Sequence, residues 1–133
     1  MNTRILMGVS ALFMATLGVV ASFFPQEILT HTGSHPERLA VLVVQINGAL
    51  YMGFAILNWT ARANLIGGIY SRPVALGNFF HFAVVGAVLS KALMAGQNVA
   101  EMMAGAAVYS AFAISFGWVL FTHPRMIASS EPE

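Results

Sequence analysis

Four long apolar stretches within 133 residues constrain this chain more than any other feature of its sequence. Two of them, Ile5–Phe24 and Leu39–Trp59, contain no Asp, Glu, Lys, Arg or His, and the other two cover residues 74–93 and 101–121. At 1.5 Å per residue, a helix of about 20 residues crosses a hydrocarbon core of roughly 30 Å. The sequence therefore predicts an all-α fold, an antiparallel four-helix transmembrane bundle.

The composition supports lipid rather than water as the main solvent of this surface. Hydrophobic residues make up 58% of the chain and charged residues 8%, whereas soluble domains average about 25% charged residues. The basic residues are dispersed and the net charge is +1, so we expect no nucleic acid partner. The absence of cysteine excludes disulfides, thiolate metal sites and a cysteine nucleophile.

The connections between the stretches are short. They cover residues 25–38, residues 60–73 and a few residues around Gln97, which leaves no room for a second soluble domain. Pro73 suits the first turn of the third helix. We therefore expect residues 1–133 to form a single integral membrane domain.

The distribution of Lys and Arg predicts the orientation, because positively charged connections tend to stay in the cytoplasm. Arg38 and Lys91 fall on one side of the predicted membrane, against four arginines on the other. Those four are Arg4, Arg62, Arg72 and Arg125. The pattern favours a bacterial inner membrane protein, multi-pass, with both termini in the cytoplasm. Trp59 and Trp118 then lie near the inner interface, which indole side chains prefer.

The first stretch also has an alternative interpretation as a cleaved secretory signal. Arg4, the apolar run and Val19-Val20-Ala21 loosely resemble such a signal and its cleavage site. A run of this length is long for a signal, and Phe23-Phe24 would follow the cut, so we favour a retained span.

Small residues form stripes that permit close approach of helix backbones, and contact of this kind drives helix association in lipid. The longest stripe lies in the first stretch and consists of Gly8, Ala11, Ala15, Gly18 and Ser22. Shorter ones are Ala107, Ala111 and Ser115 in the fourth stretch, Ala49 and Gly53 in the second, and Gly77 in the third. We expect these stripes to pack inside the bundle, with a homodimer as the alternative use.

Two of the stretches carry polar residues at helical spacing. Asn47, Tyr51 and Asn58 share one stripe of the second stretch, because separations of four and eleven residues are close to whole turns. In the third stretch, Asn78 and His81 are three residues apart and are therefore neighbours on the helix surface.

These polar groups are expected to meet at one depth of the membrane. Tyr51 and His81 each lie roughly 12 Å from the inner boundary, and Tyr109 of the fourth stretch falls at a comparable depth. An unmade hydrogen bond in hydrocarbon costs several kcal/mol, so the groups should converge inside the bundle. The predicted cluster, a ligand-binding or a structural one, consists of Asn47, Tyr51, Asn58, Asn78, His81 and Tyr109.

His81 is the first candidate for a functional residue, since an ionisable group within the membrane indicates a functional site. The alternative is that His81, Asn78 and Asn47 fix the helix register by hydrogen bonding. Both interpretations remain open, and the sequence identifies no catalytic residue.

Several classes of site find little support in the sequence. No carboxylate lies deep in any stretch, which argues against a proton or cation exchanger of the small multidrug type. A haem between His81 and His123 is disfavoured because their depths differ by roughly 12 Å or more. His31 and His35 are four residues apart, but Gly33 argues against the helix that would align them, so no metal and no cofactor is predicted.

Arg62 and Arg72 flank the Gly67-Gly68-Ile69-Tyr70 connection. Two guanidinium groups at a lipid surface suit a lipid headgroup phosphate or another anion, and topology-setting charge is the alternative reading. We therefore keep this pair as a candidate anion site.

The middle third of the chain resembles small bacterial four-span proteins that we group as DoxX-like. The resemblance is carried by Asn58-Trp59-Thr60-Ala61-Arg62, by Gly67-Gly68 with Arg72-Pro73, and by Gly77-Asn78-Phe79-Phe80-His81. It implies four spans and a link to membrane redox chains, without a catalytic motif. A fainter similarity to the membrane eicosanoid and glutathione enzymes, in Glu37-Arg38 and Asn47, lacks the acidic residue that should follow Asn47.

The sequence thus predicts a noncatalytic membrane protein, an accessory subunit or a binder of a small lipophilic molecule. Its expected partners are the lipid bilayer, further copies of the chain or a larger membrane complex, and that ligand. The alternative is a membrane-embedded enzyme or transporter that acts on a lipophilic substrate through the polar cluster around His81.

Overall fold

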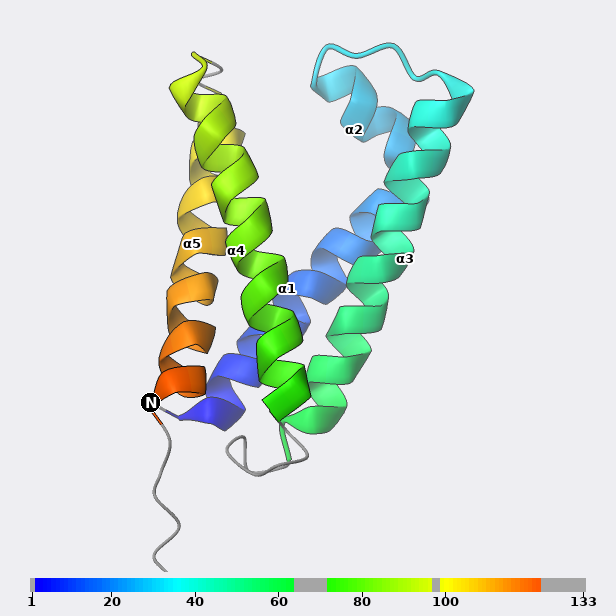
Figure 1. The fold of residues 1–133 in the computed structure, drawn as a ribbon. Coiled ribbons are helices and arrows are strands. Elements are labelled where there is room, and N and C mark those ends of the chain that lie inside the picture. Colours follow the sequence, from blue (N-terminus) through cyan, green and yellow to red (C-terminus); the bar gives the residue numbers. More distant parts are fainter. Residues whose placement is uncertain (1, 64–71, 97–98, 123–133) are drawn as a thin grey trace, which may run out of the picture. The chain divides into compact units, whose positions relative to one another are not determined.

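The computed structural model describes residues 2–63, 72–96 and 99–122. These residues form five helices and no strand, so the predicted all-α helical bundle is confirmed as the fold class. Four helices are long and apolar enough to cross a membrane (Figure 1). They are α1 (Thr3–Phe23), α3 (Arg38–Ala61), α4 (Arg72–Met94) and α5 (Ala100–Phe121). Each begins and ends within two residues of the predicted stretch, and the chain is a multi-pass membrane protein.

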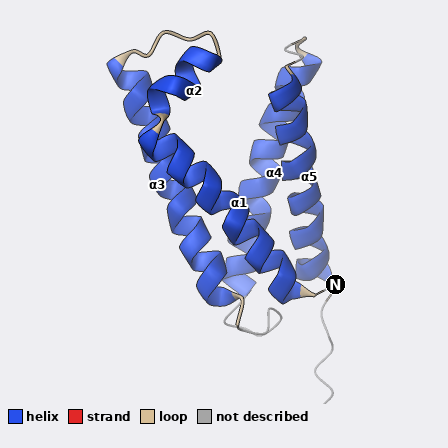
Figure 2. Cartoon of the chain, turned by 180° about the vertical axis from the view of Figure 1, so that it is seen from behind, coloured by secondary structure: helices blue, strands red, loops and turns tan. Residues whose placement is uncertain are grey.

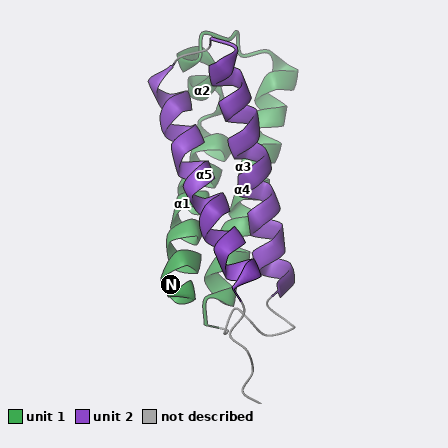
Figure 3. Ribbon diagram, turned by 60° about the vertical axis from the view of Figure 1, so that its left-hand side comes forward, with its two compact units in different colours: residues 1–65 green, residues 66–133 purple. Residues whose placement is uncertain are grey.

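The chain divides into two compact units, Met1–Leu65 and Ile66–Glu133 (Figure 3). The first contains α1, α3 and a short helix, α2 (Pro25–His31), that the sequence did not predict. The second contains α4 and α5. The single domain over residues 1–133 and the closure of all four spans into one antiparallel bundle stay predictions.

In the first unit, α1 and α3 run antiparallel and cross closely (Figure 2). A Cβ atom added at Gly18 would lie 2.9 Å from the Met52 backbone nitrogen, and one at Gly48 would lie 2.7 Å from the Ser22 nitrogen. Only glycine allows the two backbones to come this near. The predicted packing of Gly18 and Ser22 against a neighbouring helix is therefore confirmed.

The other predicted stripes of small residues do not form the packed seams. Ala49, Gly53, Gly77 and Ala111 are exposed, and a Cβ atom at Gly53 or Gly77 would have nothing within 4 Å. Spacing of four residues occurs on several faces of an apolar helix, and the spacing alone does not choose between them. In α3 the packed glycine is Gly48, about 100° around the helix from Ala49.

In the second unit, α4 and α5 are also antiparallel. Gly86 faces Ser110, where an added Cβ would lie 3.4 Å from the Ser110 nitrogen, and Gly117 faces the ring of Phe79. Between these contacts lies Phe82, which is fully buried. Its ring stacks on those of Phe112 and Phe116 at centroid distances of 4.6 and 5.7 Å.

Large apolar side chains cover much of the outside of both units. Among the exposed ones are Leu12, Phe23, Ile56, Val88 and Ile114. In water such a surface would aggregate, whereas hydrocarbon solvates it without cost. The surface therefore agrees with the span assignment.

Candidate functional site

A buried polar bridge joins the long helices of the first unit. Asn58 is fully buried, and its Nδ2 atom donates a hydrogen bond to Ser10 Oγ at 3.1 Å. The Ser10 hydroxyl in turn donates to the Met7 carbonyl at 3.0 Å. The sequence prediction missed Ser10. It could have been found, because the buried amide of Asn58 in the second stretch needs a partner and Ser10 offers a hydroxyl in the first.

Asn47 does not join this interior. It is exposed, and its Nδ2 atom donates to the carbonyl of Val43 in its own helix at 3.1 Å. The direction in which α3 faces α1 changes along the helix. Asn58 and Gly48 both contact α1, but their directions around the α3 axis differ by about 80°, because two crossing helices do not keep the same face in contact along their whole length. Asn47 shares the direction of Asn58 but does not pack against α1 as Asn58 does, and its place inside a bundle of all four spans stays a prediction. Tyr51, one turn on, is half-buried.

In the second unit, Asn78, His81 and Tyr109 lie in or beside an aromatic core. Asn78 is fully buried and donates to the Val74 carbonyl at 2.9 Å. The His81 ring lies 6.0 Å from that of Tyr109, and Tyr109 is buried. The predicted proximity of these two rings is therefore seen. With Phe82, Phe112 and Phe116 they form what we call the aromatic cluster.

The six predicted polar residues are thus divided between the two units. Unit 1 contains Asn47, Tyr51 and Asn58, and unit 2 contains Asn78, His81 and Tyr109. Convergence of the two groups on one ligand stays a prediction.

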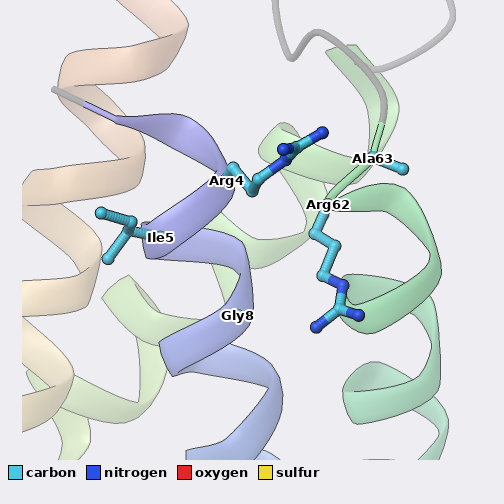
Figure 4. Close-up of a pocket in the computed structure, with 5 residues that line it drawn as sticks. All are labelled: Arg4, Ile5, Gly8, Arg62 and Ala63. Atoms are coloured by element: carbon cyan, nitrogen blue, oxygen red, sulfur yellow. The ribbon is translucent and has the colours of Figure 1, made fainter.

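A cavity of about 330 Å³ lies where α1 begins and α3 ends, lined by Arg4, Ile5, Gly8, Arg62 and Ala63 (Figure 4). The side chain of Arg4 extends from α1 toward the end of α3, while Ile5 points away from it. The Arg62 guanidinium carbon lies 3.2 Å from the centre of the Trp59 ring, a cation–π contact. Two guanidinium groups thus border one cavity.

A second cavity, of about 500 Å³, lies where α4 begins and α5 ends. Arg72 and Pro73 line it from the start of α4, together with Leu76, and Leu120 and Phe121 line it from α5. Of the predicted anion pair, Arg62 lines the cavity of unit 1 and Arg72 that of unit 2. The Gly67–Tyr70 connection between them lies outside the described residues, so their joint action stays a prediction.

A third cavity, of about 500 Å³, is lined by Gln26, Glu27, Thr30 and His31 of α2. The helix ends at His31, and Gly33 follows with φ at +74°, so His35 lies beyond the helix and is not aligned with His31. Within residues 2–63, 72–96 and 99–122, no group of three or more His, Cys, Asp or Glu side chains is placed to hold a metal ion. His123 and Arg125 lie outside these ranges.

Comparisons with protein families, with curated proteins and with solved structures find no match to this chain. The DoxX-like resemblance therefore stays a prediction. What the chain can bind must be argued from its own cavities.

Proposed function

We propose that this chain is a noncatalytic protein of a bacterial cell membrane that binds an amphiphilic acid in the cavity at Arg72. The ligand class is a molecule with one acidic group and an apolar body, such as a long-chain fatty acid. The observation that carries this function is one guanidinium group on a cavity whose other described lining residues are apolar.

The cavity fits such a ligand in size and in chemistry. Its volume of about 500 Å³ falls in the range of roughly 300–1,000 Å³ that small-molecule sites occupy. Leu76, Leu120 and Phe121 offer apolar contact to a hydrocarbon tail. Arg72 supplies the planar fork of donors that matches a carboxylate.

The charge of Arg72 is not balanced by a carboxylate within the described part of unit 2. The acidic residue of that part is Glu101, in the first turn of α5, whereas the cavity adjoins Phe121 at its other end. Twenty residues of helix separate the two by about 30 Å. A ligand carboxylate would supply a counter-charge to Arg72.

The interior polar groups support a binding protein rather than an enzyme. The Asn58 amide is bonded to Ser10 across the helix pair, and Asn78 is bonded to its own helix. His81 lies against aromatic rings in the packed core of unit 2. The hydrogen bonds of the two amides are what a structural role requires. Catalysis or transport around His81 stays the alternative prediction.

We further propose that the end of unit 1 with Arg4 and Arg62 faces the cytoplasm. Because α1 and α3 are antiparallel, both arginines lie at the same end of the helix pair. Positive charge near the end of a span favours the cytoplasmic side of the membrane. A cysteine introduced at Ala63 should then be protected from impermeant thiol reagents in intact cells, while one at Ser34 should be labelled. The reverse pattern would contradict the orientation.

The binding function is tested with a fluorescent fatty acid displaced by oleate or by oleyl alcohol, in nanodiscs of neutral lipid. Oleate should displace the probe at least tenfold more effectively than the alcohol, which has a similar tail and no charge. Arg72→Gln should weaken oleate binding about tenfold or more, since a charge-assisted bond contributes about 1.5–3 kcal/mol. Arg72→Lys keeps the charge and should retain part of the binding.

A bulky side chain provides the second test. Leu76→Trp should fill the cavity and reduce binding, whereas Leu50→Trp places the same ring on an exposed position of α3 and should not. Equal displacement by oleate and oleyl alcohol, or wild-type binding in the Arg72→Gln variant, would contradict the proposed function.

A further inference from the structure

The cavity between α1 and α3 brings together two cations that are far apart in the chain. Arg4 belongs to the first turns of α1, and Arg62 follows directly after α3. Both line the same cavity of about 330 Å³ (Figure 4). We propose that this cavity, which both arginines line, binds a phosphate group. The site lies in unit 1 and is independent of the acid-binding cavity proposed in unit 2.

Two like charges at one cavity are unfavourable unless an anion lies near them. Within the described part of unit 1, the acidic residues are Glu27 of α2 and Glu37, just before α3. Both lie at the opposite end of the helix pair from Arg4 and Arg62, about 36 Å away along α3. Neither of these two carboxylates can neutralise the cavity, so the two charges suit an anionic ligand.

Arg62 is held in a geometry that leaves its donors available to a ligand. Its guanidinium group lies flat enough over Trp59 for a 3.2 Å approach to the ring centre. Stacking uses the face of the guanidinium plane, whereas its five N–H donors point outward from the edge. A phosphate, with several oxygens, can accept two parallel bonds from this edge and further bonds from Arg4.

The start of α1 adds a weaker contribution of the same sign. Asn2 caps the helix through a bond from the Arg4 backbone nitrogen to its side-chain oxygen at 3.1 Å. The first turn contains no acidic residue, so the positive end of the helix dipole is not offset by one there. This field acts with the two arginines and would not create a site without them.

Gly8 forms part of the cavity wall. A substitution at this position can block ligand binding without disturbing the packing of α1 on α3. A Cβ atom added there would meet nothing within 4 Å, unlike one at Gly18 on the same sequence stripe, which would meet the Met52 backbone at 2.9 Å. A larger side chain at position 8 therefore has space to enter the cavity without pushing α1 away from α3. Gly53 offers the matched control, because it is exposed on α3 and also has nothing within 4 Å.

The phosphate has two sources at the end of a membrane span, a phospholipid headgroup and a soluble phosphate compound. Both present the same oxygens to the arginines. We therefore assign the site to the phosphate group, and the two sources are separated by experiment.

The test is a titration of the full chain in neutral detergent, followed by native mass spectrometry. The probes are dioleoyl phosphatidic acid, dioleoyl phosphatidylcholine and inorganic phosphate. The phosphatidic acid should bind at least tenfold more tightly than the choline lipid, which has the same tails. Gly8→Leu and the double variant Arg4→Gln/Arg62→Gln should each lose that preference, while Gly53→Leu should keep it.

Competition identifies the source. If millimolar inorganic phosphate displaces the phosphatidic acid, the site accepts soluble phosphate. If it does not, the lipid headgroup is the ligand, and either result supports the site.

A Trp118→Phe background allows Trp59 fluorescence to report ligand binding beside Arg62. Equal binding of the two lipids, or wild-type preference in the double arginine variant, overturns the assignment. Should Gly8→Leu fail to fold, the double arginine variant alone decides the outcome.

Discussion

Replacement of Gly48 by alanine tests the close approach of α1 and α3 directly. The new methyl group would lie 2.7 Å from the Ser22 nitrogen and 3.0 Å from the Ala21 carbonyl carbon, both backbone atoms. Ordinary van der Waals contact begins at about 3.4 Å, so the two helices must separate by roughly 0.7 Å. Overpacking of this kind costs about 1–3 kcal/mol.

Alanine also favours the helix itself, by at most about 1 kcal/mol over glycine. We therefore expect Gly48→Ala to lower the free energy of unfolding by about 1–2 kcal/mol, or roughly 5–30-fold in the unfolding equilibrium. Gly53→Ala, in the same helix, has only the propensity gain because its Cβ meets nothing within 4 Å. The control should be neutral or slightly more stable than the wild type.

The measurement is reversible unfolding by SDS in mixed micelles, followed by Trp59 fluorescence in a Trp118→Phe background. Trp59 lies in α3, so the signal reports the first unit. If Gly48→Ala proves as stable as Gly53→Ala, the two backbones do not approach as closely as described, and the reasoning from glycine contacts is refuted.

Two further predictions concern the interior polar bridge and the aromatic cluster. A double-mutant cycle of Asn58→Leu and Ser10→Ala should give a coupling of about 0.6 kcal/mol, up to about 1.7, since such bonds are worth little more in membranes; no coupling in the unfolding assay would contradict the bridge. Phe82→Ala should lower stability by about 3 kcal/mol, because the ring is fully buried and stacks on two others. Phe80→Ala, next to it and 57% exposed, should cost well under half as much, and equal losses would place the core elsewhere.

The spans were predictable because hydrocarbon imposes one requirement on every residue that faces it. Charge-free runs of the right length meet that requirement, and the observed helices follow the predicted limits within two residues. The face used for packing carries no such signature. Gly48 and the pair Ala49 and Gly53 are all small, and only the crossing of α1 over α3 decides that Gly48 is the one in contact.

The cavities were predictable in part. Charge placement put Arg4 and Arg62 on the same side, and the antiparallel pair brings them to one cavity. The sequence prediction nevertheless paired Arg62 with Arg72, because those two flank a single connection. The cavity gives Arg62 a neighbour that the order of the chain did not suggest, since a residue at the end of one span lies beside the start of the span that packs against it.

The hydrocarbon environment also explains why a polar residue within a span is a poor indicator of an interior binding site. A short amide or hydroxyl can satisfy itself on the nearest turn of its own helix, as Asn47 does on Val43 and Thr16 on Leu12. Such a residue needs no partner helix and no ligand, so its presence within a span does not identify a site.

A guanidinium group differs in this respect. It carries a full charge and five donors, more than the free carbonyls of one helix end can match, and it needs an anion or a wet surface. Where two of them line one cavity with no carboxylate at that end of the described unit, as Arg4 and Arg62 do, an anionic ligand is the partner that we propose. Ligand chemistry in this protein is therefore expected at the ends of its spans, where the arginines lie, rather than midway along them, where the amides are already bonded.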